Sequence, residues 1–329
     1  MRVIVLGGTR FVGRALVDQL LSARHEVLVV HRGRHEPPEL AHVPHLHVDR
    51  VALPERAPEL RGFRPDALVD LAAMTAADAD LALLAAPPGA RLLVASSIDV
   101  YRAASAVWDG GVSDPVPLDE RSALRTRPPA ETGPAPPGWD FAPAEYEKLD
   151  VERAYLARGA TVCRLPMVYG EYDYKRREEF ILRRVRAGRR HIPFGTGTWL
   201  WSRAHVTDVA AGLRLALENP RAQGEIFNLC EPRCATIWEW AEQILAAAAH
   251  QAELVPVPDS ALPSDLEITG GIRQHWLATP AKAQALLGWR PRTAEETVAR
   301  SVRWHLANPP RVADHDFTDD ERALSLVPA

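Results

Sequence analysis

The sequence contains little lysine and no block of basic charge. Of its 329 residues 39 are basic, but only three are lysine: Lys148, Lys175 and Lys282. The formal net charge is −4 and is spread along the chain. The spread of charge argues against a large, sequence-independent nucleic-acid surface, since such surfaces concentrate positive charge.

Cysteine and long apolar runs are also scarce. The three cysteines, Cys163, Cys230 and Cys234, form no ligand pair with metal-site spacing, so we expect no metal centre. No run of about 18 apolar residues exists to cross a bilayer, and the chain enters a strand directly after Met1, without a signal-like segment. We expect a cytoplasmic protein without a membrane partner.

Short continuous apolar runs alternate with segments of helical periodicity. Strands are expected at residues 3–6, 27–30, 67–71, 91–95, 161–165 and 226–229, and helices near 12–20, 77–86, 145–158, 180–187, 209–218, 238–248, 280–287 and 294–305. Strands without polar alternation are buried on both faces. The pattern predicts an α/β fold, a Rossmann-type doubly wound parallel sheet with a smaller C-terminal α+β substrate domain.

This pattern predicts a domain division. Residues 1–168, with a return segment at about 204–232, should form the dinucleotide-binding part; 169–203 and 233–310 should form the substrate part, and 311–329 a flexible tail. Residues 102–143 are rich in proline and glycine and predict a long loop, which is often functional.

A glycine-rich turn follows the first strand. Gly7 and Gly13 are the first and last glycines of a Gly-x-x-Gly-x-x-Gly array, and Thr9, Arg10, Phe11 and Val12 lie between them. Gly7 allows the tight turn, and Gly13 lets the helix approach the strand. The helix N-terminus then offers N–H groups to a pyrophosphate. A dinucleotide is predicted.

The end of the second strand bears on which dinucleotide is bound. An acidic residue there binds the ribose 2′-hydroxyl, whereas arginine accommodates a 2′-phosphate. Here the chain has His31, Arg32 and Arg34 and no carboxylate directly at the strand end. NADP(H) is therefore favoured over NAD(H).

Several further segments resemble the extended short-chain dehydrogenase/reductases of the NAD(P)-dependent epimerase/dehydratase type. They are the glycine turn, Ser96 to Tyr101, Lys148 with Glu152, Arg164 to Gly170, His205 to Ala210 and Leu287 to Pro291, all in the family's order. The glycine turn most resembles an atypical branch that includes stem-loop RNA-binding proteins. The resemblance implies adenine contact by Asp49, a nicotinamide-side strand end at Leu71, Ala72 and Ala73, and catalytic roles for Ser97 and Lys148.

The family's tyrosine is missing from its usual place. In the family it precedes the lysine by four residues, but here that position is Ala144. Tyr146 is two residues before Lys148, which on an ideal helix turns the side chains about 200° apart. Three explanations stay open: the helix starts irregularly and brings Tyr146 into the site, another group supplies the proton, or conventional catalysis is lost. The candidates for another group are Tyr101, Asp99, Tyr169, Tyr172 and His205.

The function expected from these residues is an NADP(H)-dependent oxidoreductase or epimerase-like enzyme. Ser97, Tyr146 and Lys148 would act at the nicotinamide, and Tyr101, Tyr169, Trp201 and Arg203 are predicted to face a carbohydrate-like alcohol or ketone. A homodimer is possible. The alternatives are a cofactor-binding regulatory or RNA-binding protein of the atypical branch, and a dehydratase that uses Asp99 as an added acid or base.

Overall fold

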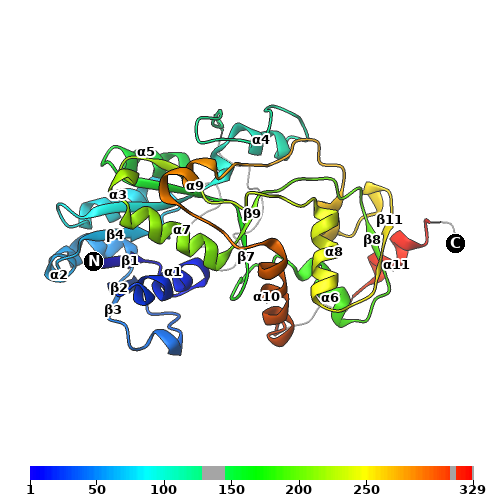
Figure 1. Cartoon of the computed structure of the whole chain (residues 1–329), viewed down its shortest axis with the longest axis horizontal. Coiled ribbons are helices and arrows are strands. Elements are labelled where there is room, and N and C mark those ends of the chain that lie inside the picture. The colour runs from blue at the N-terminus through cyan, green and yellow to red at the C-terminus, as the bar shows by residue number, and fades with distance from the viewer. Residues whose placement is uncertain (128–144, 312–315, 328–329) are drawn as a thin grey trace.

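The computed structural model describes residues 1–127, 145–311 and 316–327 (Figure 1). Within them a parallel sheet runs in the order β3-β2-β1-β4-β5-β6-β10. Its strands are β1 (Arg2–Leu6), β2 (Glu26–His31), β3 (His45–His47), β4 (Ala67–Asp70), β5 (Arg91–Ser97), β6 (Thr161–Leu165) and β10 (Ile226–Asn228). The strand order reverses between β1 and β4, as in a doubly wound sheet, which confirms the predicted fold class.

Helices cover both faces of this sheet (Figure 1). One face carries α1 (Phe11–Ser22), α7 (Val206–Glu218) and α9 (Ala281–Leu287), and the other carries α2 (Ala57–Gly62), α3 (Ala76–Ala85) and α5 (Lys148–Leu156). Side chains of β1 alternate between the two cores: Val3 and Val5 face α1 and α7, whereas Ile4 and Leu6 face α3 and α5. This double burial explains the uninterrupted apolar runs.

A third core lies beyond the sheet. It is built mainly from α6 (Glu179–Arg186), α8 (Ile237–Ala247), α10 (Ala294–Ala307) and β8 (His191–Phe194), and β8 pairs with β11 (Glu253–Pro256). A separate parallel pair joins β7 (Met167–Tyr169) to β9 (Arg203–His205). Helices α6 and α8 and the β8–β11 pair lie on the side of the molecule away from the sheet, and the β7–β9 pair lies between them and the sheet (Figure 1). The residue boundaries of the predicted domains stay a prediction.

Two predicted irregular segments contain helices. The 102–143 stretch begins with α4 (Arg102–Trp108), whose alanines are buried; residues 128–144 lie outside the described part of the chain. The tail expected to be flexible contains α11 (Thr318–Leu324), so that expectation is wrong there. Its buried Asp320 accepts hydrogen bonds from the buried Arg184 guanidinium, which anchors an otherwise polar segment.

Candidate active site

The glycine turn has a backbone geometry that requires glycine at both of its ends. Gly7 has a φ of +87°, and a Cβ added at Gly13 would lie 2.1 Å from the Gly7 carbonyl oxygen. Thr9 is buried, while Arg10 is exposed and precedes α1 without a side-chain cap. The first N–H groups of α1, beginning at Phe11 and Val12, therefore lack a side-chain acceptor from the cap position. This cradle fits a dinucleotide pyrophosphate.

The predicted adenosine side lies at the ends of β2 and β3. Arg32 and Arg34 are exposed beyond β2, and Asp49 caps the short helix that follows β3 by accepting from the Val51 N–H. The His31 ring instead meets the His45 ring, with 2.9 Å between His31 Nε2 and His45 Nδ1. Burial, together with His45 and His47, lowers the pKa of His31 to about 4.

The end of β4 is organised by the buried carboxylate of Asp70. The Ala72 and Ala73 N–H groups donate to its Oδ1 at 2.9 and 3.0 Å. Arg50 donates to both Asp70 oxygens at 2.8 Å, and the Tyr155 hydroxyl donates to Oδ2 at 2.7 Å. Asp70 therefore shapes the turn at Leu71, Ala72 and Ala73 and ties it to α5.

The charge on Asp70 is stabilised by its partners. Burial alone would raise the pKa of this carboxyl, but the Arg50 guanidinium and the Tyr155 hydroxyl outweigh burial, and the pKa lies below its ordinary value. Asp70 lies inside the apolar strand predicted at residues 67–71, and this role was not predicted. The acidic residue that ends an otherwise apolar strand was the available signal.

Ser97, Asp99, Tyr146 and Lys148 come together where β5 ends and α5 begins; we call them the buried cluster. The Tyr146 hydroxyl donates to Asp99 Oδ2 at 2.5 Å, and the Ser97 hydroxyl oxygen accepts from the Asp99 N–H at 3.2 Å. Lys148 Nζ donates to the carbonyls of Ala73 and Ala95 at 2.5 and 3.1 Å. Asp99 Oδ1 is buried and has no hydrogen-bond donor among the described residues.

The buried cluster shifts the protonation equilibria of its members. Burial raises the pKa of Asp99, although the Tyr146 hydrogen bond and the Arg125 charge oppose the rise. Burial and the nearby Asp99 charge raise the pKa of Tyr146 well above its usual value. Burial lowers the pKa of Lys148 to about 8, against the attraction of Asp99 and Asp70. Of these shifts, that of Lys148 brings a pKa close to neutral pH, whereas the raised pKa of Tyr146 keeps its hydroxyl protonated there.

Tyr146 reaches this position because α5 begins only at Lys148. The backbone before the helix is held at Glu147, whose N–H donates to the Met74 carbonyl at 3.0 Å. The Glu147 carboxylate forms a two-point pair with the buried Arg125 guanidinium at 2.6 and 2.7 Å. The ideal-helix angle between Tyr146 and Lys148 therefore does not apply. Ala144 lies outside the described residues.

The predicted substrate residues are mostly enclosed. Tyr101 and Tyr169 are fully buried; their hydroxyls donate to Asn228 at 2.7 Å and to Glu231 at 2.9 Å. Arg203 is buried and donates to the Ala235 carbonyl. Trp201 is partly exposed. Of these residues, Trp201 alone keeps a partly exposed side chain for a ligand.

Trp201 belongs to a tryptophan stack beside the buried cluster. It stacks on Trp199 and Trp276, with centroid distances of 4.9 and 6.0 Å. The Trp276 indole N–H donates to the Ile98 carbonyl at 3.1 Å, directly before Asp99. Trp108, which is 42% exposed, meets Trp276 edge to face.

A cavity of about 540 Å³ opens elsewhere, between α1, α7 and α10. Its lining includes Phe11, Arg14, Glu171, Thr207, Arg292 and Trp304. Because no member of the buried cluster lines it, we do not assign the chemistry to this cavity.

The glycine cradle, the parallel sheet and the buried cluster define an NAD(P)-binding Rossmann enzyme class. The chain belongs to the NAD dependent epimerase/dehydratase family, whose model matches residues 3–230. Membership in this family confirms the prediction that the protein is an NAD(P)-dependent enzyme of the oxidoreductase or epimerase type. The individual roles of the predicted site residues stay predictions.

Two relatives and one solved structure illustrate the range of similar proteins. The chain is 25% identical to the chloroplast stem-loop binding protein of 41 kDa b of Arabidopsis thaliana, over 98% of this chain and 84% of that protein. It is 29% identical to 2'-dehydrokanamycin reductase of Streptomyces kanamyceticus, over 78% and 70%. The dTDP-glucose 4,6-dehydratase of Bacillus anthracis, solved with NAD, shares 18% identity with a TM-score of 0.69, over 94% and 97% of the two chains, and shows the fold.

None of the helices in the described ranges is both long and apolar enough to span a bilayer.

Proposed function

We propose that this protein is an NADP(H)-dependent oxidoreductase that acts on a carbohydrate-like alcohol or ketone. The observation that carries the proposal is the contact between the Tyr146 hydroxyl and Asp99, beside Ser97 and Lys148. It supplies a tyrosine to a site whose usual tyrosine position is Ala144. The bound nicotinamide would accept or supply the hydride.

The buried cluster can move one proton in step with the hydride. In the reducing direction Tyr146 gives its hydroxyl proton to the substrate carbonyl oxygen, and Asp99, when protonated, returns a proton to Tyr146 through their 2.5 Å contact. The raised pKa of Asp99 favours this protonated form. Ser97 would hold the substrate oxygen, and Lys148 would contribute a positive charge. In the oxidising direction the same protons move in reverse.

The substrate class is inferred from the tryptophan stack. Aromatic rings bind the apolar faces of sugar rings, and near the end of β5 the exposed Trp108 offers such a ring, whereas Trp276 is buried and the partly exposed Trp201 is stacked on Trp199 and Trp276. The name of the 2'-dehydrokanamycin reductase, a relative of this chain, supports reduction as the reaction.

The preference for NADP(H) rests on the two arginines after β2, Arg32 and Arg34. Titration of nicotinamide fluorescence measures both cofactors in one assay. Tighter binding of NADH than of NADPH would contradict the preference. A cytoplasmic location and a homodimer belong to the same proposal, and cell fractionation and light scattering would test them.

Substitution of Tyr146 by phenylalanine tests the mechanism. We expect Tyr146→Phe to lower kcat by about 10²- to 10⁴-fold, the range typical of general acid catalysis, with NADPH affinity unchanged. The matched control is Tyr174→Phe, since Tyr174 is half exposed. Full activity in Tyr146→Phe would show that another group supplies the proton.

RNA binding is the second candidate function, because the chloroplast relative is a stem-loop binding protein that aligns with nearly the whole chain. The absence of a basic block in the sequence speaks against it. Filter retention of stem-loop RNA by micromolar protein at physiological salt would support it, and loss of retention as salt is raised would identify a phosphate-dominated interface.

A further inference from the structure

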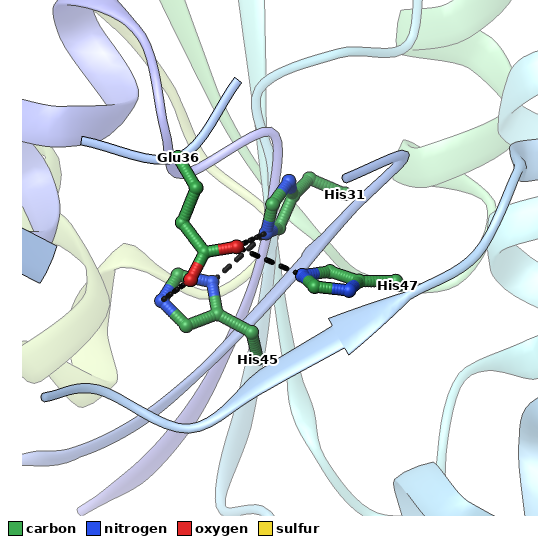
Figure 2. A group of neighbouring side chains, drawn as sticks. All are labelled: His31, Glu36, His45 and His47. Carbon is green, nitrogen blue, oxygen red and sulfur yellow. Dashed lines mark hydrogen bonds and ion pairs between the residues drawn. The ribbon is translucent and has the colours of Figure 1, made fainter. Parts of the chain in front are cut away.

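Three histidines gather at the free edge of the sheet, where β2 and β3 end (Figure 2). His45 and His47 are two residues apart on β3, so their side chains leave the same face of the strand. His31 is the register partner of His47 on the neighbouring strand. The sheet register therefore places all three imidazoles on one face, and Glu36 reaches them from the loop between the strands.

The four side chains point toward a common centre (Figure 2). His31 Nε2 lies 2.9 Å from His45 Nδ1, and Glu36 Oε2 lies 3.0 Å from His47 Nε2. Glu36 Oε2 also comes within 4.0 Å of His31 Nε2, and Glu36 Oε1 lies 3.8 Å from His45 Nε2, the nitrogen that contacts the Leu40 carbonyl rather than the other ligand atoms. One nitrogen or oxygen from each residue lies within 4.8 Å of all the others.

These separations match a tetrahedral metal shell. Zinc binds imidazole nitrogen at about 2.0–2.1 Å, so neighbouring ligand atoms in a tetrahedral site are about 3.3 Å apart. The distances between ligand atoms here bracket that value. Small side-chain rotations would suffice to centre an ion, because Glu36 and His47 are 35% and 54% exposed.

The surroundings of His45 favour ligation. Its Nε2 lies 2.9 Å from the Leu40 carbonyl, so the proton sits on Nε2 and the Nδ1 lone pair faces the cluster. A ligand histidine usually donates its second N–H to such a carbonyl. His31 must change its tautomer, since its Nδ1 now accepts from the Gly33 N–H at 3.2 Å. Metal binding would move the His31 proton to Nδ1 and turn the Gly33 peptide away.

We propose that His31, His45, His47 and Glu36 form a binding site for a divalent transition-metal ion of the zinc type. Three imidazoles and one carboxylate suit Zn²⁺, and also Cu²⁺ and Ni²⁺, better than Mg²⁺ or Ca²⁺. The four ligands would fill a tetrahedral shell, which is typical of structural rather than catalytic zinc. The site shares no residue with the buried cluster, but His31 directly precedes Arg32, one of the two arginines to which the NADP(H) preference is assigned.

The site would stabilise a vulnerable part of the fold. β3 is a short edge strand that follows a connection of irregular chain and one short 3₁₀ turn. An ion held by β2, β3 and their connecting loop would fasten this edge to the sheet. Because a ligand that binds only the folded state adds stability by mass action, zinc should also raise the unfolding temperature.

Zinc titration of the full-length, tag-free protein tests the proposal. After chelator treatment and dialysis, Zn²⁺ would be titrated against a chromophoric competitor, and bound zinc counted by mass spectrometry. We expect one ion per chain and a Co²⁺ derivative with the strong visible absorption of four-coordinate cobalt. Absence of stoichiometric zinc at micromolar concentrations would overturn the proposal.

Matched histidine variants assign the ligands. His47→Ala removes a half-exposed side chain and should weaken zinc binding more than tenfold without unfolding the protein. His45→Ala should do the same, with circular dichroism to verify folding. The control is His42→Ala, an exposed histidine in the same loop outside the cluster. Equal zinc affinity in wild type and His47→Ala would refute this ligand set.

Discussion

The glycine turn and the buried cluster lie at two ends of one candidate cofactor site. The backbone determines the shape of the turn, whereas side chains determine that of the cluster. The turn is shaped by backbone, with no side chain beyond Cα at Gly7 and Gly13. The buried cluster is shaped by side chains from β5, the turn after it, α5 and the segment before α5; Asp99, Tyr146 and Lys148 are buried, and Ser97 is partly exposed. The comparison shows that one site can combine a steric requirement with an electrostatic one.

Substitutions in the two regions should therefore impair the protein in different ways. An added methyl group would disable the turn without changing any charge. Loss of one charged group, without any new steric contact, would disable the buried cluster or the Asp70 network beside it. The substitutions below separate these two kinds of failure, beginning with the largest expected effect.

Asp70→Ala should have the largest effect, on stability. It leaves the Arg50 guanidinium without its bidentate partner and the Ala72 and Ala73 N–H groups without their acceptor. Breaking a buried pair from one side costs about 3–5 kcal/mol, measurable by urea denaturation. The control Asp80→Ala, at an exposed position of α3, should stay within about 0.5 kcal/mol of wild type. A similar loss of unfolding free energy in both variants would show that the contacts of Asp70 contribute no more stability than an exposed aspartate does.

Gly13→Ala should abolish tight cofactor binding. The new Cβ would overlap the Gly7 carbonyl oxygen, so helix α1 must move away from the turn. We expect NADPH affinity to fall at least about 100-fold, which corresponds to about 2.7 kcal/mol. Gly62→Ala is the control, because its Cβ would meet nothing within 4 Å. Unchanged NADPH affinity in Gly13→Ala would show that the turn does not hold the cofactor.

Lys148 should produce opposite pH effects on activity and stability. Activity that needs its ammonium should fall as pH rises through about 8. Stability should move the other way, since between pH 8 and 10 the unfolded chain binds this proton more tightly than the native state does. The unfolding free energy of wild type should therefore rise relative to Lys148→Met, by at most about 1.4 kcal/mol per pH unit. A parallel pH dependence of stability in the two proteins would contradict the lowered pKa.

Arg32→Ala should have the smallest effect, confined to cofactor choice. Loss of a charge-assisted contact to a 2′-phosphate should weaken NADPH binding about tenfold, or about 1.4 kcal/mol, and leave NADH binding unchanged. Arg61→Ala, an exposed arginine on α2, serves as the control. An equal loss for both cofactors would place Arg32 outside the 2′-phosphate site.

The sequence predicted best what local sterics and periodicity determine. Six of the seven strands of the large sheet, and the glycine turn, depend on neighbouring residues and could be inferred from apolar spacing; β3 and the two-stranded pairs β7–β9 and β8–β11 were not predicted. The burial of Asp320 could not, because its partner Arg184 is 136 positions away and the segment itself is polar. Helix α4 was not predicted either, because its alanines lie in a stretch otherwise rich in proline and glycine.

The candidate site was predicted in part. Ser97 and Lys148 followed from the family resemblance, whereas Asp70, Arg50 and the Arg125–Glu147 pair depend on contacts across the fold. Tyr146 was left open because its orientation depends on where α5 begins. The histidine cluster was missed because cysteine spacing was considered and the pairing of His31 with His47 across two strands was not.

The segment before α5 carries Tyr146 on a path of its own, held by Met74 and Arg125 rather than by helical hydrogen bonds. The number of residues between tyrosine and lysine is thus free of the helical repeat. A tyrosine two residues before the lysine and a tyrosine four residues before it can therefore present the same two side chains to a site. A shortened spacing by itself does not mark a protein as inactive.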